Sequence, residues 1–124
     1  METKTNVTNS EWYVLKCLWD KSPQTLTELT VQLHNEIGWS KSTCATMVRR
    51  MTEKKLIDFT LSGKTKHFFP LAKKDVIVKQ ETKDFLKRIY DGSVGMLING
   101  LVQAEDLSDE EIRELQDILK KAQR

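Results

Sequence analysis

A change of hydrophobic period near residue 57 is the feature that most restricts the fold of this chain. Before it, apolar residues recur at the three- and four-residue spacing of helices over about residues 8–20, 25–38 and 40–56. After it, FTLSGKTKHFFP places β-branched and aromatic residues on both sides of Gly63, which predicts two short strands joined by a tight turn at Ser62-Gly63. The chain therefore begins with three helices and continues into a β-hairpin.

Capping signals indicate where these helices begin and end. Thr8 is followed three residues later by Glu11, and Thr25 by Glu28, and each pair predicts a capping box. Gly38 suits the left-handed residue that follows a helix. Ser40 or Ser42 is expected to cap the third helix.

Each predicted helix carries an apolar stripe, and together the stripes predict one hydrophobic core. The stripe residues are Trp12, Leu15, Leu18 and Trp19 in the first helix, Leu26, Leu29, Leu33 and Ile37 in the second, and Cys44, Met47, Val48 and Met51 in the third.

The opposite face of the third helix is unusual, because it carries small hydroxyls and paired arginines. A helix that turns its apolar stripe inward must present the remaining side chains outward, and these are Lys41, Ser42, Thr43, Ala45, Thr46, Arg49 and Arg50. Residues 40–70 contain seven Lys and Arg but two acidic residues, whereas residues 71–124 contain ten and eleven. A local basic block in a nearly neutral chain is typical of a nucleic-acid contact surface.

Three helices with short connections and a basic hairpin are the order of a winged helix-turn-helix domain. We predict a mainly α protein with a winged helix-turn-helix DNA-binding domain in residues 1–70. Hydroxyls and arginines near a helix N-terminus can reach phosphates and base edges in the major groove, and lysines around a hairpin turn can bind further phosphates. The expected DNA-binding residues are Thr25, Lys41, Ser42, Thr43, Thr46, Arg49, Arg50, Lys64 and Lys66.

Residues 71–124 return to helical spacing and are predicted to form a C-terminal helical arm. Asp91-Gly92 is a natural break, and Ser108 with Glu111 predicts another capping box. About fifty residues do not easily close a core, so we expect the arm to dimerise with a second copy. An alternative is that it folds back as a cap on the first domain. The expected dimerisation residues are Phe85, Leu86, Ile89, Tyr90, Leu97, Ile98, Leu101, Ile112, Leu115 and Leu119.

Other classes of protein have little support in the sequence. Cys17 and Cys44 lie far apart and inside apolar patterns, so neither a disulfide nor a paired-thiolate metal site is indicated, and a reducing cytoplasm fits. Cys44 lies on the apolar stripe of its helix, which favours a small core residue. His34 and His67 have no second ligand at metal spacing. No apolar run approaches the roughly 18 residues of a membrane span. We therefore expect a cytoplasmic protein that is no enzyme, has no cofactor or metal, and does not contact a membrane.

Four segments resemble the family of penicillinase and methicillin-resistance repressors and their copper-responsive relatives. SEWYVLKCLWD resembles the family's opening helix, WSKSTCATMVRRMTEKKLI its recognition helix, GKTKHFFP its wing, and FLKRIYDGSVGMLINGLVQAEDLSDEEIRELQDIL its dimer arm. The resemblance implies a homodimeric repressor that binds an inverted repeat of the TACA/TGTA type and blocks transcription of a resistance or homeostasis operon.

The resemblance also bears on individual residues. Thr43, Thr46 and Arg50 stand where the family has Thr, Thr and Arg, whereas Ala45 departs from the basic residue often found there. Resistance repressors are inactivated by a protease at an Asn-Phe bond in the dimer arm, and Gly100-Leu101 lies at that point here. The paired C-terminal cysteines of copper-responsive members have no counterpart.

The alternative to a DNA-binding repressor is a protein-interaction module. In that reading the winged helix is a scaffold that does not recognise a DNA sequence, and the C-terminal helices bind a different protein.

Overall fold

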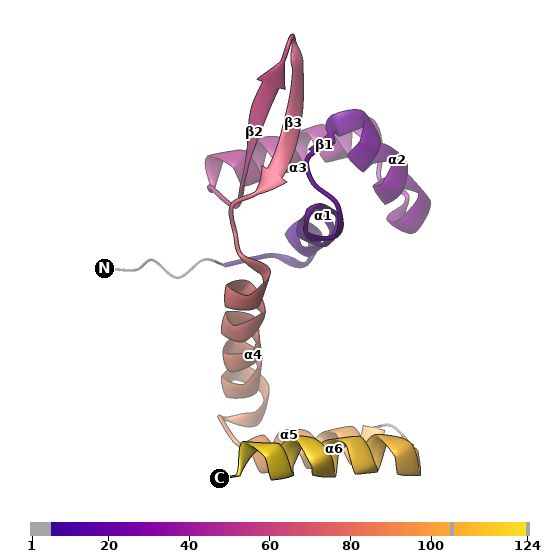
Figure 1. The fold of residues 1–124 in the computed structure, drawn as a ribbon, viewed down its shortest axis with the longest axis vertical. Coiled ribbons are helices and arrows are strands. Elements are labelled where there is room, and N and C mark those ends of the chain that lie inside the picture. Colours follow the sequence, from indigo (N-terminus) through magenta and orange to yellow (C-terminus); the bar gives the residue numbers. More distant parts are fainter. Residues whose placement is uncertain (1–5, 105, 124) are drawn as a thin grey trace, which may run out of the picture. The chain divides into compact units, whose positions relative to one another are not determined.

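The computed structural model describes residues 6–104 and 106–123 (Figure 1). The elements in chain order are α1 (Asn9–Asp20), β1 (Gln24–Thr25), α2 (Leu26–Ile37), α3 (Lys41–Glu53), β2 (Ile57–Ser62), β3 (Thr65–Pro70), α4 (Lys74–Tyr90), α5 (Val94–Ala104) and α6 (Asp109–Ala122). The predicted order of three helices, a hairpin and further helices is confirmed. The chain divides into two compact units, one ending at Lys79 and the other beginning at Gln80, so the division falls inside α4.

The three strands form one antiparallel sheet in the order β1-β3-β2. Ser62 pairs with Thr65, so the hairpin turn consists of Gly63 and Lys64, one residue later than Ser62-Gly63. Gly63 has a φ of 63°, and glycine at the first position of a two-residue loop suits a hairpin because it adopts positive φ without steric cost. The strand β1, which pairs Thr25 with His67, has no counterpart in the sequence prediction.

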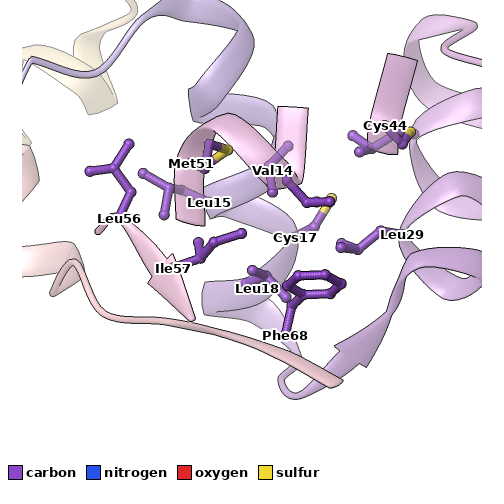
Figure 2. Close-up of a cluster of buried hydrophobic side chains, with 12 residues drawn as sticks. Val14, Leu15, Cys17, Leu18, Leu29, Cys44, Met51, Leu56, Ile57 and Phe68 are labelled. Carbon is purple, nitrogen blue, oxygen red and sulfur yellow. The ribbon is translucent and has the colours of Figure 1, made fainter. Parts of the chain in front are cut away.

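The core of the first unit lies between α1, α2, α3 and the base of the hairpin (Figure 2). The predicted stripes of α2 and α3 hold for Leu29, Leu33, Cys44, Val48 and Met51, which are buried. The predicted stripe of α1 is correct for Leu15 and Leu18, which are buried, but Trp12 and Trp19 are only half-buried. Val14 and Cys17, which the prediction did not include, are buried instead. The remaining buried members of the cluster are Leu56, Ile57 and Phe68.

The predicted capping boxes are present at the starts of α1, α2 and α6. The box of α1 has a further partner. Glu11 is 4% exposed, and both its carboxylate oxygens accept hydrogen bonds of 2.9 Å from Nζ of Lys54, at the end of α3. Nζ of Lys54 also donates to the carbonyl of Asn6, at 2.9 Å. The start of α1 is thereby joined to the end of α3.

Two further contacts hold the hairpin and the start of α4 against the helices. The carbonyl of Leu56 accepts hydrogen bonds from the backbone N–H groups of Leu71 and Ala72, at 2.9 and 3.0 Å. The indole N–H of Trp19 donates to the carbonyl of Ala72, at 2.8 Å. The two ends of the hairpin are therefore tied to each other and to α1.

The helices after the hairpin bury few side chains. Ile77 is the buried residue of α4, whereas its neighbour Val76 is exposed. Neither α5 nor α6 has a buried residue among those described. Helices α4 and α5 approach closely at Gly100: a Cβ at this position would lie 2.7 Å from the hydroxyl of Tyr90, so a larger residue would require the Tyr90 side chain to shift. No helix in the described ranges is both long and apolar enough to cross a membrane.

We expect the stability of the first unit to decrease as the pH rises from about 9 to 11. Burial raises the pKa of the Cys17 thiol from 9.0 to about 11, so the unfolded chain loses this proton at lower pH than the folded one. The difference corresponds to about 2–3 kcal/mol lost across that window. Urea unfolding of the protein and of Cys17→Ala at pH 8 and 10.5 measures it. The variant should lose less stability over this interval, and an equal loss would remove Cys17 as the cause.

Candidate nucleic-acid interface

The N-terminus of α3 is a cluster of hydroxyls without a carboxylate. Ser40, and not Ser42, is the N-cap: its Oγ accepts a hydrogen bond of 3.2 Å from the backbone N–H of Thr43. This Oγ also lies 3.1 Å from the hydroxyls of Ser42 and Thr43. The first turns of α1, α2 and α6 each contain a capping Glu, whereas that of α3 contains no acidic residue. The positive end of the α3 dipole is therefore open to an external anion.

The outward face of α3 continues this surface along the helix. Ser42, Thr43 and Arg50 are exposed, and Thr46 is half-buried. Arg49 is also exposed and forms an ion pair with Glu53 one turn later, at 3.5 Å. Exposed pairs of this kind contribute little, so a phosphate can replace Glu53 as the partner of Arg49.

The hairpin carries the other predicted basic residues. Lys64 in the turn and Lys66 in β3 are exposed. Nζ of Lys66 lies 4.5 Å from the centroid of the Phe59 ring, a cation–π contact that holds this ammonium on the side of the hairpin facing α3. Lys64 and Lys66 line the same open groove as Arg49 of α3, so the structure brings these three cations together.

Thr25 has a different environment from the other predicted DNA-binding residues. Its hydroxyl accepts a hydrogen bond from the backbone N–H of Glu28, and its own backbone N–H donates to the Glu28 carboxylate. The hydrogen bond from the Thr25 backbone N–H to the carboxylate, together with the Thr25 hydroxyl, lowers the pKa of Glu28, which places an anion at the start of α2. The Thr25 side chain is thus already used within the domain.

Sequence reasoning missed two residues that shape this surface. Phe59 holds Lys66, and Glu53 competes for Arg49. The four-residue spacing of Arg49 and Glu53 is a signal that could have identified the ion pair. The contact between Phe59 and Lys66 crosses the hairpin, and it follows from the observed strand register.

The predicted dimerisation residues lie in α4, α5 and α6, and their side chains are exposed or half-buried within one chain. Phe85 and Tyr90 form an edge-to-face pair with ring centroids 6.0 Å apart. Leu101 and Leu115 line an open pocket of about 350 Å³ together with Leu107 and Ile118. The most exposed members of the set are Phe85, Ile89, Leu101, Ile112 and Leu119.

Two other predictions concern protease cleavage of the arm and metal binding. The Gly100–Leu101 bond lies inside α5, and its cleavage by a protease stays a prediction. Across residues 6–104 and 106–123, no group of three or more His, Cys, Asp or Glu side chains is placed to hold a metal ion.

Known repressors are similar to this chain over most of its length. The family model described as "Penicillinase repressor" matches residues 7–121. The methicillin resistance regulatory protein MecI of Staphylococcus aureus is 30% identical over 122 residues, which cover 98% of this chain and 99% of MecI. The penicillinase repressor of Bacillus licheniformis is 26% identical over 113 residues, which cover 91% and 88% of the two chains.

Solved structures show the same fold. The DNA-binding domain of the repressor BlaI, in a solution structure, has a TM-score of 0.53 and 23% identity, and the match covers 60% of this chain and 90% of that domain. A mutant of MepR from S. aureus has a TM-score of 0.51 and 21% identity, with coverage of 94% and 77%. The mainly helical, winged helix-turn-helix prediction is thereby confirmed. The match to the family model and to MecI over nearly the whole length shows that the chain belongs to the penicillinase repressor family.

Proposed function

We propose that the protein is a transcriptional repressor that binds operator DNA as a homodimer. The observation that carries the proposal is the combination, on one side of the first unit, of a carboxylate-free α3 N-terminus, the outward Thr and Arg residues of α3, and the lysines of the hairpin. The names of the relatives, penicillinase repressor and methicillin resistance regulatory protein, support it.

Each part of the surface has a distinct role in the proposal. Thr43, Thr46 and Arg50 contact base edges in this proposal. Thr43 and Thr46 lie in the first two turns of α3 and Arg50 in its last turn, all on the side away from the core. Ser42 and the cations bind phosphates and position the helix. The Thr25 hydroxyl already caps α2, so in this proposal Thr25 lies near the DNA at the start of α2 without binding it through its side chain. The phosphate-binding cations are Lys41, Arg49, Lys64 and Lys66.

The arm supplies the dimer in this proposal. The helices α5 and α6 bury no residue within one chain, and apolar side chains on three helices are exposed. A second copy would cover them, and its two-fold symmetry matches an inverted repeat of the TACA/TGTA type. The regulated genes in this proposal form a resistance or homeostasis operon.

We expect specific binding to the DNA upstream of the protein's own gene, with a steep dependence on salt. The four phosphate-binding residues of each protomer place up to eight cations near phosphates in the dimer. An affinity loss of about 10³- to 10⁵-fold between 50 and 200 mM salt is typical of 6–10 phosphate contacts. A gel shift at both salt concentrations, with unrelated DNA as competitor, measures this.

The competitor distinguishes the two readings of the sequence. A shift that survives unrelated DNA and weakens with salt supports an operator-binding repressor. If both DNAs shift alike, or neither does, α3 does not recognise this sequence and the interaction module becomes the better description.

A further inference from the structure

The space between α3 and the hairpin is larger and more apolar than phosphate binding requires. We name it the α3–wing groove. It has a volume of about 560 Å³ and opens to solvent. This volume lies within the range of about 300–1,000 Å³ that is common for small-molecule sites. The lining residues are Leu26, Ala45, Val48, Arg49, Thr52, Glu53, Phe59, Lys64, Thr65, Lys66 and Phe68.

The floor of the groove consists of aliphatic and aromatic side chains. Phe59 and Phe68 pair across β2 and β3 with their rings edge to face, at a centroid distance of 5.8 Å. Leu26 and Val48 complete the apolar surface from α2 and α3. Phe59 is half-buried while Phe68 is 5% exposed, so the Phe59 ring borders both the core and the groove.

The rim of the groove is cationic. Arg49, Lys64 and Lys66 line it, and Glu53 is its one acidic lining residue. Nζ of Lys66 lies over the Phe59 ring, 4.5 Å from its centroid, which places a positive charge directly above this part of the floor. An anionic group above this ring would therefore meet Lys66, and it would meet Arg49 when that side chain leaves Glu53.

We propose that the α3–wing groove binds a small aromatic carboxylate, and that this ligand competes with DNA. The ring of the ligand packs against Phe59, Val48 and Leu26, and the carboxylate binds Lys66 and Arg49. A DNA phosphate can use the same cations but gains nothing from the apolar floor, so only a ligand with an apolar part uses the whole groove. The competition with DNA rests on the proposed function, whereas binding of the carboxylate does not.

Glu53 provides an internal test, because it is an anion already placed at the rim. A ligand carboxylate must share Arg49 with Glu53 and is repelled by it. Replacing Glu53 by Gln frees Arg49 and removes the repulsion, and both effects strengthen binding of an anion. The same substitution should not strengthen binding of a neutral ligand of the same shape.

The first experiment titrates the full-length protein, without DNA, with 2-naphthoate and with its neutral analogue 2-naphthamide. Amide chemical shifts locate the site by NMR, and the titration gives the dissociation constants. We expect saturable changes at Ala45, Val48, Thr52 and Phe59. Naphthoate should bind about tenfold or more tightly than naphthamide, since hydrogen bonds to a charged group are stronger than those to a neutral one. Shift changes confined to α5 and α6, or equal binding of both compounds, would overturn the proposal.

Three variants refine the test. Lys66→Gln should weaken naphthoate binding about fivefold or more, and Glu53→Gln should strengthen it about twofold or more, as expected for charges near a protein surface. Lys16→Gln, on the exposed side of α1, is the charge-matched control for Lys66→Gln and should bind like the unaltered protein. Equal effects of Lys66→Gln and Lys16→Gln would show only a general charge effect.

The second experiment measures fluorescence anisotropy of labelled operator DNA while naphthoate is added. Saturating naphthoate should lower DNA affinity about tenfold, and naphthamide at the same concentration should not. If naphthoate binds the groove but leaves DNA affinity unchanged, the competition is wrong. If the protein binds no specific DNA, the proposed function fails, whereas the NMR titration still decides whether the groove binds the carboxylate.

Discussion

Replacing Thr46 by Tyr should reduce specific DNA affinity by about 100-fold or more and leave the fold intact. Thr46 lies midway along α3, on the side away from Cys44, Val48 and Met51, where a helix in the major groove comes closest to the base edges. A tyrosine there would hold the helix away from the bases. A 100-fold loss corresponds to about 2.7 kcal/mol, which equals one or two lost base contacts.

The matched control is Thr60→Tyr, in the middle of β2. Thr60 is exposed and alternates with Phe59 and Leu61, so it faces away from α3. Anisotropy titrations with the upstream DNA compare the two variants, and thermal unfolding shows whether both remain folded. If Thr46→Tyr binds as tightly as the control and protects the same bases from nuclease, Thr46 does not lie in the interface.

Replacing Ile112 by Asp should convert the proposed homodimer to a monomer at micromolar concentration. Ile112 is 41% exposed in the protomer and belongs to the apolar face of α6. In a two-fold interface the substitution occurs twice, and loss of two buried isoleucines costs about 3–6 kcal/mol. The dissociation constant should therefore rise by about 10²- to 10⁴-fold. An Asp in the first turns of a helix is favoured by the helix dipole, so α6 itself should persist.

Arg113→Gln is the control, because it changes the net charge by the same amount on the next residue, which lies on the polar face of α6. Sedimentation equilibrium gives the dimer constant of both variants, and circular dichroism reports helix content. A dimer as stable in Ile112→Asp as in Arg113→Gln would place the interface elsewhere and would favour the arm as a cap on its own first unit.

Much of the fold could be predicted because its signals are local. A capping box occupies four consecutive residues, so Thr8 with Glu11 and Thr25 with Glu28 identified the starts of α1 and α2. The two-residue strand β1 could not be predicted, since a strand of this length has no period. Its Gln24 is buried because Nε2 donates to the carbonyls of Cys17 and Lys21, a polar arrangement that hydrophobic spacing does not reveal.

The helical wheel also has limits where several elements surround one helix. In α1 the spacing indicated Trp12 and Trp19 as core residues, but Val14 and Cys17 are the more buried pair. Helix α1 contacts α2, α3 and β3, so its buried surface extends beyond a single stripe.

The candidate interface also has a part that local sequence predicts and a part that it does not. The exposure of Ser42, Thr43 and Arg50 follows from helix geometry, and the sequence predicted it. The α3–wing groove depends on where the hairpin lies relative to α3, which no local pattern encodes. The observed proximity of Arg49, Lys64 and Lys66 is therefore a result of tertiary structure.

The contact between Glu11 and Lys54 makes the two positions unequal in the substitutions they tolerate. The Glu11 carboxylate accepts a hydrogen bond from the backbone N–H of Thr8 as well as from Lys54, whereas Lys54 only donates. A charge reversal that places Lys at 11 and Glu at 54 would restore the attraction but leave the Thr8 N–H without its acceptor. In a library randomised at both sites, functional clones should therefore contain Lys or Arg at 54 with Glu at 11, and the reversed pair should be absent.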